Sequence, residues 1–158
     1  MAAPSADRTD EEKFMKAALN EARKAEVKSE VPVGAVIVCD GKIIARAHNS
    51  RTTKCDPTAH AEVLALRKAG AKLGHWNLEG CELYVTKEPC VMCAGAIVLS
   101  RIKRVRYGAF DKRFGCGGTV MNLTNNPTFN HRAETEGGLM ECECASLLTA
   151  FFRERRKK

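Results

Sequence analysis

Two short motifs of histidine, glutamate and cysteine constrain this chain more than any other feature of its sequence. His60-x-Glu62 stands near the start of one expected helix, and Pro89-Cys90-x-x-Cys93 stands at the start of another. Zinc prefers tetrahedral nitrogen and sulfur ligands, and a catalytic zinc site keeps three protein ligands and leaves the fourth position open for water. His60, Cys90 and Cys93 are three such ligands, so the fold is expected to bring the two helix starts together.

The spacing inside each motif supports this interpretation. Cys90 and Cys93 are three residues apart, so they occupy neighbouring positions in a helical first turn and both thiolates can reach one metal. The positive end of the helix dipole favours their ionised form. Glu62 follows His60 by about 200° around a regular helix, so only an irregular first turn brings its carboxylate beside the metal. There it could take a proton from water that zinc activates and pass it to a leaving group.

Length and composition indicate one globular domain with an excess of positive charge. The 158 residues, 44% of them hydrophobic, suit a single packed core, and no apolar run approaches the ~18 residues of a membrane-spanning helix. We expect a flexible tail over 1–8, one domain over 9–156 and a basic end at 157–158. The formal net charge of +7 favours polyanionic partners such as nucleic acid. Eight cysteines without a recognisable secretory signal favour a reducing compartment and mostly free thiols.

Apolar periodicity and turn residues predict alternating helices and strands. Thr9 is the expected N-cap of an opening helix, and Thr58 is the expected N-cap of the helix that contains His60. Asp40-Gly41 favours the type I′ turn of a β-hairpin. This pattern indicates an α/β fold with a mixed sheet. The expected strands cover 33–39, 42–47, 81–86, 105–110 and part of 129–136, and later helices cover 90–100 and 139–156.

The complete pattern, His-x-Glu followed by Pro-Cys-x-x-Cys, resembles the zinc-dependent cytidine and deoxycytidylate deaminases. Residues 56–62, 83–96 and 130–132 resemble the bacterial tRNA adenosine deaminases more closely, and this likeness runs over nearly the whole chain. The resemblance implies a three-layer α/β/α sandwich with a mixed, mostly five-stranded sheet, usually a homodimer. It also implies hydrolytic conversion of adenosine to inosine at the wobble position of a tRNA anticodon, and we expect a cytoplasmic enzyme.

Carried over position by position, the resemblance implies roles for five residues. His60, Cys90 and Cys93 would bind one zinc ion per chain, Glu62 would move protons, and Asn49 would hold the flipped base. This chemistry needs a polyanion held in place, so the basic end of the chain is the expected contact with the anticodon stem-loop. The cations expected to touch RNA are Arg153, Arg155, Arg156 and Lys157.

Other functions fit part of the pattern. The metal motif alone does not separate an RNA deaminase from an enzyme that acts on free nucleobases or nucleosides, although the net charge and the basic end argue against that enzyme. A zinc-stabilised module that binds nucleic acid without catalysis is a second alternative. Glu62 argues against it, because a structural site has no use for an unligated carboxylate. A closed zinc staple would need a fourth ligand, and Cys55 is not expected to supply it.

Several other conspicuous residues have simpler explanations. Trp76 is expected to be a packing residue rather than a platform for base stacking, whereas His131 is kept as a candidate contact with nucleic acid. Cys116, among glycines in an expected flexible loop, is interpreted as an unpaired thiol. Lys87 stands where a leucine is familiar in the family that this chain resembles.

The expected core thiols are Cys39, Cys81, Cys142 and Cys144. A cluster of cations fits a solvated strand edge and a phosphate contact equally well, and consists of Arg101, Lys103, Arg104, Arg106, Lys112 and Arg113.

Overall fold

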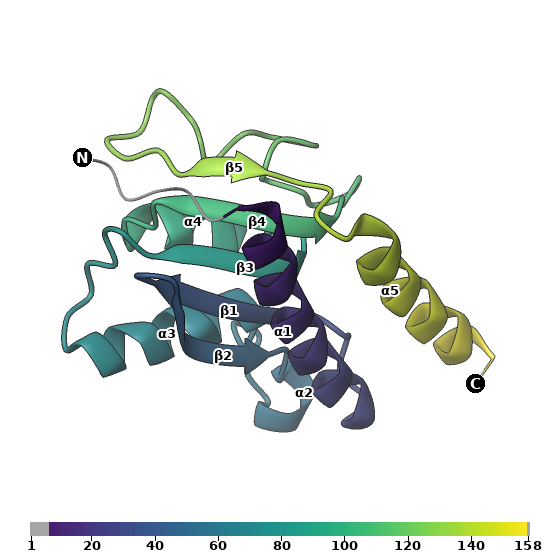
Figure 1. The fold of residues 1–158 in the computed structure, drawn as a ribbon. Coiled ribbons are helices and arrows are strands. Elements are labelled where there is room, and N and C mark those ends of the chain that lie inside the picture. The colour runs from purple at the N-terminus through teal and green to yellow at the C-terminus, as the bar shows by residue number, and fades with distance from the viewer. Residues whose placement is uncertain (1–6, 158) are drawn as a thin grey trace.

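The computed structural model describes residues 7–157 and shows a mixed sheet with helices on both faces (Figure 1). The helices are α1 (Arg8–Val27), α2 (Arg51–Lys54), α3 (Ala61–Leu73), α4 (Val91–Leu99) and α5 (Glu141–Arg156). The strands are β1 (Gly34–Cys39), β2 (Lys42–His48), β3 (Glu82–Lys87), β4 (Arg104–Ala109) and β5 (Glu134–Glu136). The predicted α/β/α sandwich with a five-stranded mixed sheet is confirmed.

The strand order β2-β1-β3-β4-β5 brings several chain segments to one edge of the sheet. β1 runs antiparallel to both β2 and β3, whereas β4 runs parallel to β3 and to β5. The carboxyl ends of β2, β3 and β4 and the amino end of β1 therefore lie at the same edge. The residues that follow the first three of these ends are Asn49, Glu88 and Phe110. This edge is where the candidate site is built.

The core explains why β1 has an unbroken apolar sequence. Ala35 and Ile37 pack in the layer of α3 and α4, while Val36 and Val38 pack in the layer of α1 and α5. Successive strand side chains alternate between faces, so a strand covered on both sides needs apolar residues at every position. The following turn has positive φ at Asp40-Gly41, 51° and 74°, which confirms the predicted hairpin.

The first helix begins earlier than predicted. Asp7 is its N-cap, and the Asp7 side chain accepts a hydrogen bond from the Asp10 N–H at 2.9 Å, so the prediction of Thr9 as the cap is wrong. Aspartate and threonine are both good N-caps, and sequence alone does not rank two candidates that lie two residues apart. Arg8, expected in the tail, is therefore helical, and residues 1–6 of that predicted tail lie outside the described residues.

The prediction of Thr58 as the cap of α3 is also wrong. The N–H and the hydroxyl of Thr58 both donate to the Asp56 side chain, at 2.8 Å and 2.7 Å, and form a turn before the helix. The helix instead begins after His60, which is its N-cap. The short helix α2 was not predicted, because its four residues are too few for a periodic apolar pattern.

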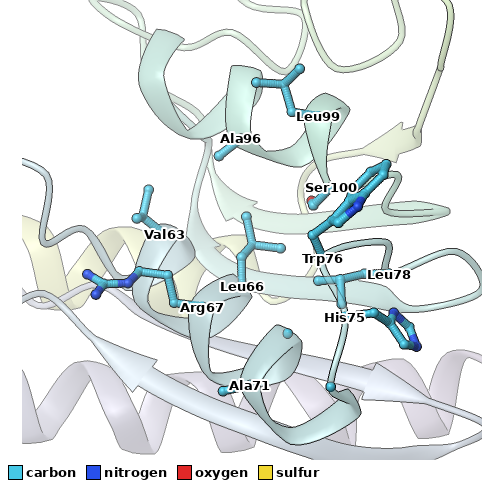
Figure 2. Close-up of a pocket in the computed structure, with 12 residues that line it drawn as sticks. Val63, Leu66, Arg67, Ala71, His75, Trp76, Leu78, Ala96, Leu99 and Ser100 are labelled. Atoms are coloured by element: carbon cyan, nitrogen blue, oxygen red, sulfur yellow. The ribbon is translucent and has the colours of Figure 1, made fainter.

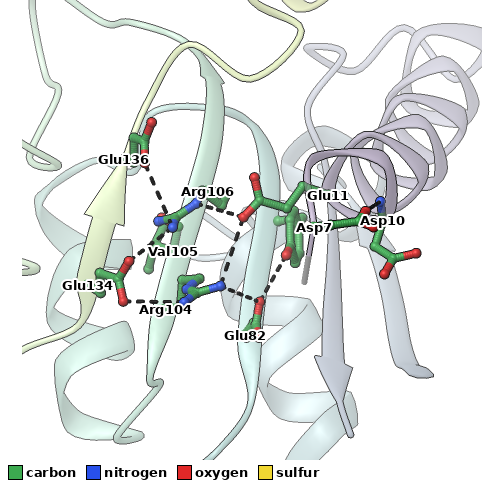
Figure 3. A network of polar contacts seen from close by, with 10 residues as sticks. Asp7, Asp10, Glu11, Glu82, Arg104, Val105, Arg106, Glu134 and Glu136 are labelled. Carbon is green, nitrogen blue, oxygen red and sulfur yellow. Dashed lines mark hydrogen bonds and ion pairs between the residues drawn. The ribbon is translucent and has the colours of Figure 1, made fainter. Parts of the chain in front are cut away.

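Two arginines of the predicted cationic cluster, Arg104 and Arg106, are buried in the structure. They are neither at a solvated edge nor free for phosphate. Figure 3 shows them between carboxylates from α1, β3 and β5. Arg106 pairs with Glu11 at 3.2 Å and with Glu134 at 3.0 Å, and Arg104 lies 3.4 Å from Glu134. Glu11 is 95 residues away from Arg106, so local sequence gives no sign of the pairing.

Other single-residue predictions have mixed outcomes. Trp76, predicted to be a packing residue, is 67% exposed within this chain. Cys142 was predicted to be a core thiol but is exposed, because α5 turns Cys144 towards the core instead. The ring of His131 hydrogen-bonds to the Ile102 carbonyl at 2.7 Å, which indicates a structural role. Cys116 is unpaired as predicted, yet it is buried rather than mobile in solvent. Among the described residues, no helix has the length and apolar character needed to cross a membrane.

Candidate active site

The starts of α3 and α4 meet at the sheet edge described above. His60 is the N-cap of α3 and Cys90 is the N-cap of α4, and both have extended backbone, with φ of −79° and −77°. Cys93 follows in the first turn of α4 and is fully buried. An N-cap precedes the helical repeat. The angular separation expected between His60 and Glu62 on a regular helix therefore does not apply, and both can face the same site.

The three predicted metal ligands lie close together. Their ligand atoms all lie within 4.8 Å of one another, and His60 Nδ1 is 3.6 Å from Cys90 Sγ and 3.5 Å from Cys93 Sγ. A tetrahedral zinc ion with bonds of about 2.0 Å to nitrogen and about 2.3 Å to sulfur places those atoms about 3.5 Å apart. The donor set and its spacing therefore fit zinc.

Electrostatics keep one of the two thiols ionised. A hydrogen bond from Cys93, helped by one from His60, lowers the pKa of Cys90 to about 3 although burial opposes the shift. The same hydrogen bond and burial raise the pKa of the Cys93 thiol, and the hydrogen bond to Cys90 raises the pKa of His60. Metals bind the thiolate and the neutral imidazole, so zinc binding at this site releases any proton that the ligands carry.

Glu62 is a buried carboxyl beside the ligand set. Its side chain belongs to the first turn of α3, and the residue is only 4% exposed. Burial raises the pKa of Glu62, although the nearby His60 acts in the opposite direction. A raised pKa moves a carboxyl towards neutral pH, which is the direction that favours general acid–base catalysis.

Asn49 is placed by the end of β2 and by the start of α3. Its side-chain oxygen accepts a hydrogen bond from the Ala61 N–H at 2.8 Å. The N-cap His60 makes no side-chain capping hydrogen bond, so Asn49 supplies the acceptor that the helix start needs. The bond also fixes the orientation of the amide. The amide nitrogen has no hydrogen-bond partner within residues 7–157, and Asn49 lines the cavity described next.

A cavity of about 530 Å³ connects these groups. His60, Glu62, Cys90 and Asn49 all line it. We call the remaining lining residues, which come from elements distant in sequence, its outer wall: they are Val31, Val33, Arg51, Lys87, Glu88, Val91, Asp111, Phe114, Phe152 and Arg155. A neighbouring hollow shares five of these outer residues and adds Arg113 and Arg156, so the cavity continues into a basic surface.

Lys87 and Asp111 form an ion pair in this outer wall. Lys87 Nζ lies 3.1 Å from Asp111 Oδ2. Burial raises the pKa of Asp111, but the N–H groups of Arg113 and Phe114 and the Lys87 ammonium outweigh burial and lower it. Lys87 stands where a leucine is familiar in the family that this chain resembles, and its charge is already paired with Asp111.

The structure brings together Glu62, Asn49 and the three predicted ligands, and it places Arg155 at the rim of the same cavity. Arg156 lines the adjoining hollow. Among the described residues that line the cavity and the hollow, neither Arg153 nor Lys157 is found. Sequence reasoning missed Glu88, Asp111 and Phe114. The glycine-rich segment 115–118 was a usable signal, because glycine often marks a close approach of the backbone to another group.

Comparison with known proteins agrees with this geometry. The family model of the zinc-binding region of cytidine and deoxycytidylate deaminases matches residues 8–109. The chain therefore belongs to this family of zinc-dependent deaminases. The tRNA-specific adenosine deaminase of Bacillus subtilis (strain 168) is 57% identical to it, over 95% of this chain and 93% of the relative. That of Aquifex aeolicus (strain VF5) is 52% identical over 92% and 95%. Within the family, the chain groups with the tRNA-specific adenosine deaminases.

Solved structures give a similar result. A structure from a study of A-to-I editing by tRNA:A34 deaminases at the wobble position of transfer RNA matches with a TM-score of 0.83. It is 46% identical and covers 86% of this chain and 99% of its own. A guanine deaminase from Nitrosomonas europaea matches with a TM-score of 0.78 and 27% identity, over 96% of this chain and 85% of its own. The fold therefore serves relatives with different substrates.

Proposed function

We propose that this protein deaminates adenosine to inosine at the wobble position of a tRNA anticodon by hydrolysis, releasing ammonia. One observation carries the proposal: the zinc-compatible cluster and the buried Glu62 share a cavity that opens onto a basic surface, in a chain 57% identical to a tRNA-specific adenosine deaminase. We assign His60, Cys90 and Cys93 as ligands of one zinc ion per chain. This enzyme would work in the cytoplasm, where tRNA and reduced thiols are both available.

The residues of the cavity have distinct tasks. A zinc ion held by the three ligands supplies Lewis acidity, which lowers the pKa of water at its open position to about 7. Glu62 would accept one proton of the attacking water and deliver it to the adenine ring, and it would then move the second proton from the new C6 hydroxyl to the departing amine, which leaves as ammonia. Asn49, whose oxygen is held by the Ala61 N–H, has its amide N–H groups left to donate to acceptor atoms of the base.

The outer wall offers aromatic rings and positive charge, which are the groups that can bind a nucleotide of an RNA loop. Phe114 and Phe152 are 64% and 41% exposed, so their rings can stack on the target base or its neighbours. Arg155 and Arg156 lie close enough to the opening to meet backbone phosphates. An anticodon loop is already partly unstacked, so extruding its adenosine costs less than flipping a base out of a duplex.

The substrate class can be tested with three candidate substrates at equal concentration. The zinc-loaded protein is incubated with an anticodon stem-loop that has adenosine at the wobble position, with free adenosine and with free guanine. We expect inosine in the digested stem-loop by mass spectrometry and slow turnover of both free compounds, because contacts with the surrounding loop place the reacting carbon. Faster turnover of guanine or free adenosine than of the stem-loop would favour a small-molecule deaminase.

We also infer that a second copy of the chain covers an apolar groove between α3 and α4. The groove has a volume of about 720 Å³, and Figure 2 shows Leu66, Trp76 and Leu99 around it. Trp76 and Leu99 are 67% and 71% exposed. Monomeric proteins rarely expose contiguous apolar surface of this kind, whereas homodimer interfaces are rich in it. The groove therefore supports the predicted homodimer.

Leu99→Glu is expected to break such a dimer, because it places a charge in the covered apolar surface. Light scattering should then give the mass of two chains for the wild type and of one chain for the variant. Val27→Glu is a matched control, since Val27 is 86% exposed at the end of α1 in the opposite helical layer, and it should remain dimeric. A wild-type protein that stays monomeric at high concentration would contradict the inference.

A further inference from the structure

Glu88 is a buried carboxylate at the junction of β3 and the zinc-ligand segment. The residue is 3% exposed and directly precedes Pro89 and Cys90. Its two oxygens accept four hydrogen bonds, all from the segment 111–119. The donors are the N–H groups of Asp111 (3.1 Å), Gly117 (3.0 Å) and Thr119 (3.1 Å) and the Thr119 hydroxyl (2.5 Å).

The segment 111–119, which we call the Glu88 loop, is wound closely around this carboxylate. The Cys116 N–H also donates to the Pro89 carbonyl at 2.8 Å. A Cβ atom added at Gly115 would lie 2.6 Å from Glu88 Oε1 and 2.4 Å from the Asp111 carbonyl oxygen, so a larger residue would displace the loop. The glycines expected to make this loop flexible instead allow its close approach to Glu88.

The Glu88 loop forms part of the outer wall of the catalytic cavity. Asp111 and Phe114 both line that cavity. Asp111 Oδ1 accepts hydrogen bonds from the N–H groups of Arg113 at 2.9 Å and Phe114 at 3.1 Å. The backbone of Phe114 is thus fixed to Asp111, whose own N–H is fixed to Glu88. Glu88 lies two residues before the proposed zinc ligand Cys90, so one side chain joins the metal segment to the loop that carries Asp111 and Phe114.

We propose that Glu88 is a positioning residue of the deaminase: its carboxylate sets the Glu88 loop, and with it Phe114, at the distance from the zinc ligands that one nucleotide fills. Hydrogen bonds from N–H groups to a carboxylate are stronger than those to a neutral acceptor, so an ionised Glu88 holds the loop more firmly than an amide could. Glu88 acts through the loop and not on the reacting atoms. The part of the proposal that concerns nucleotide entry rests on the proposed function.

Glu88→Gln tests the proposal with little change of shape. The glutamine side chain has one oxygen that accepts and one NH₂ group that cannot accept. Each carboxylate oxygen of Glu88 accepts two hydrogen bonds, so at least one of the four is lost when an NH₂ group replaces either oxygen. We expect amide hydrogen exchange in the Glu88 loop to become about tenfold faster, with the strands unchanged. For the stem-loop, KM should rise about tenfold while kcat stays within about twofold and zinc content is unchanged, because ground-state placement is what the loop supplies.

Two further variants separate positioning from general stability. Glu82→Gln removes a carboxylate at the opposite end of β3, where Glu82 accepts the hydroxyl of Tyr84 at 2.9 Å. It should lower the unfolding temperature without changing loop exchange or KM. Thr119→Val, at an exposed position, removes the hydroxyl hydrogen bond to Glu88 but keeps the one from the Thr119 N–H, and it should shift loop exchange and KM in the same direction as Glu88→Gln but less.

The proposal is overturned if Glu88→Gln leaves exchange of the Glu88 loop at the wild-type rate, or if Glu82→Gln raises KM as much as Glu88→Gln does. A large fall in kcat with unchanged KM and loop exchange would also overturn it, since Glu88 would then act on the chemistry. If wild-type protein leaves the stem-loop adenosine intact, the proposed function fails. The exchange rates still decide whether Glu88 holds the loop.

Discussion

At the scale of single residues, the site depends on an N-cap residue that does not cap its helix and on a second residue that caps it instead. His60 occupies the N-cap of α3 but turns its ring to the two cysteines, so it does not cap the helix. Asn49 accepts the Ala61 N–H in its place and is fixed at the cavity wall by that bond. The helix start is thus satisfied, and the imidazole remains available for a metal. The same hydrogen bond ties the proposed base-binding residue to the metal segment.

The role proposed for Glu62 predicts a separation of metal binding from chemistry. Glu62→Gln keeps the size of the buried side chain but cannot carry a proton, so deamination of the stem-loop should fall by about 10² to 10⁴-fold. Zinc content, measured by elemental analysis, should remain at about one ion per chain, because Glu62 is not among the three assigned ligands. A variant that loses its zinc, or that keeps the wild-type rate, would show that the assignment is wrong.

At the scale of elements, ion pairs made by two buried arginines join the first helix to the far strands of the sheet. Glu11 of α1 pairs with Arg106 of β4, and Glu134 of β5 pairs with the other side of the same guanidinium (Figure 3). Without Arg106, Glu11 and Glu134 would keep only their longer contacts with Arg104, at 3.9 Å and 3.4 Å. The ion pairs therefore contribute to the attachment of both α1 and the short strand β5, whose three residues make few other contacts.

Arg106→Met is expected to lower the free energy of unfolding by about 1.5 to 3 kcal/mol at neutral pH, as measured by urea denaturation, because it removes hydrogen bonds between charged groups. Arg106, helped by Arg104, lowers the pKa of Glu134 in the folded state. A carboxyl with a lowered folded pKa contributes stability above its unfolded pKa of about 4.3 and loses it as the pH falls through the folded value. The difference between wild type and variant should therefore shrink below about pH 4.

Lys103→Met is the matched control for that experiment. Lys103 is exposed in the same stretch of sequence, so its replacement should change the free energy of unfolding by less than about 0.5 kcal/mol. If both variants lost the same free energy of unfolding, the ion pairs of Arg106 would make no special contribution to stability.

Local sequence patterns predict the elements that they form, but they do not predict contacts between elements that are distant in the chain. The hairpin, β3, β4 and the metal motif are local signals, and the ends of these strands were predictable to within a residue, whereas β5 was placed only within 129–136. Arg104 and Arg106 have no local signal of burial, because their carboxylate partners come from distant elements. The outer wall of the cavity was missed for the same reason. Phe114 and Phe152 meet there only through the arrangement of β4 and α5.

At the scale of the whole molecule, positive charge is distributed unevenly around the cavity. The net charge is +7, yet Arg104 and Arg106 are used internally and Lys87 is paired with Asp111. Figure 1 shows the carboxyl-terminal half of α5 projecting away from the sheet. Arg155 and Arg156 on that half line the cavity and the adjoining hollow. These two arginines, rather than the net charge itself, are therefore the expected phosphate contacts.

This distribution predicts how RNA binding depends on salt. If Arg155 and Arg156 each contact a phosphate, the double variant Arg155→Gln/Arg156→Gln should reduce the slope of log K against log salt concentration by about 1.4 to 1.8. The control Arg153→Gln/Lys157→Gln removes the same formal charge from the same end of the chain. Lys157 is already paired with Glu154 at 3.3 Å, and neither control residue lines the cavity or the hollow, so the slope should change much less.

Binding of the stem-loop to the wild type and to both double variants can be followed by fluorescence anisotropy over a series of salt concentrations. Zinc content and kcat at saturating RNA should be unchanged in both variants, because the substituted side chains touch neither the ligands nor Glu62. Equal losses of slope in the two double variants would mean that RNA responds to the net charge of the chain end. The specific placement of Arg155 and Arg156 beside the cavity would then have no part in binding.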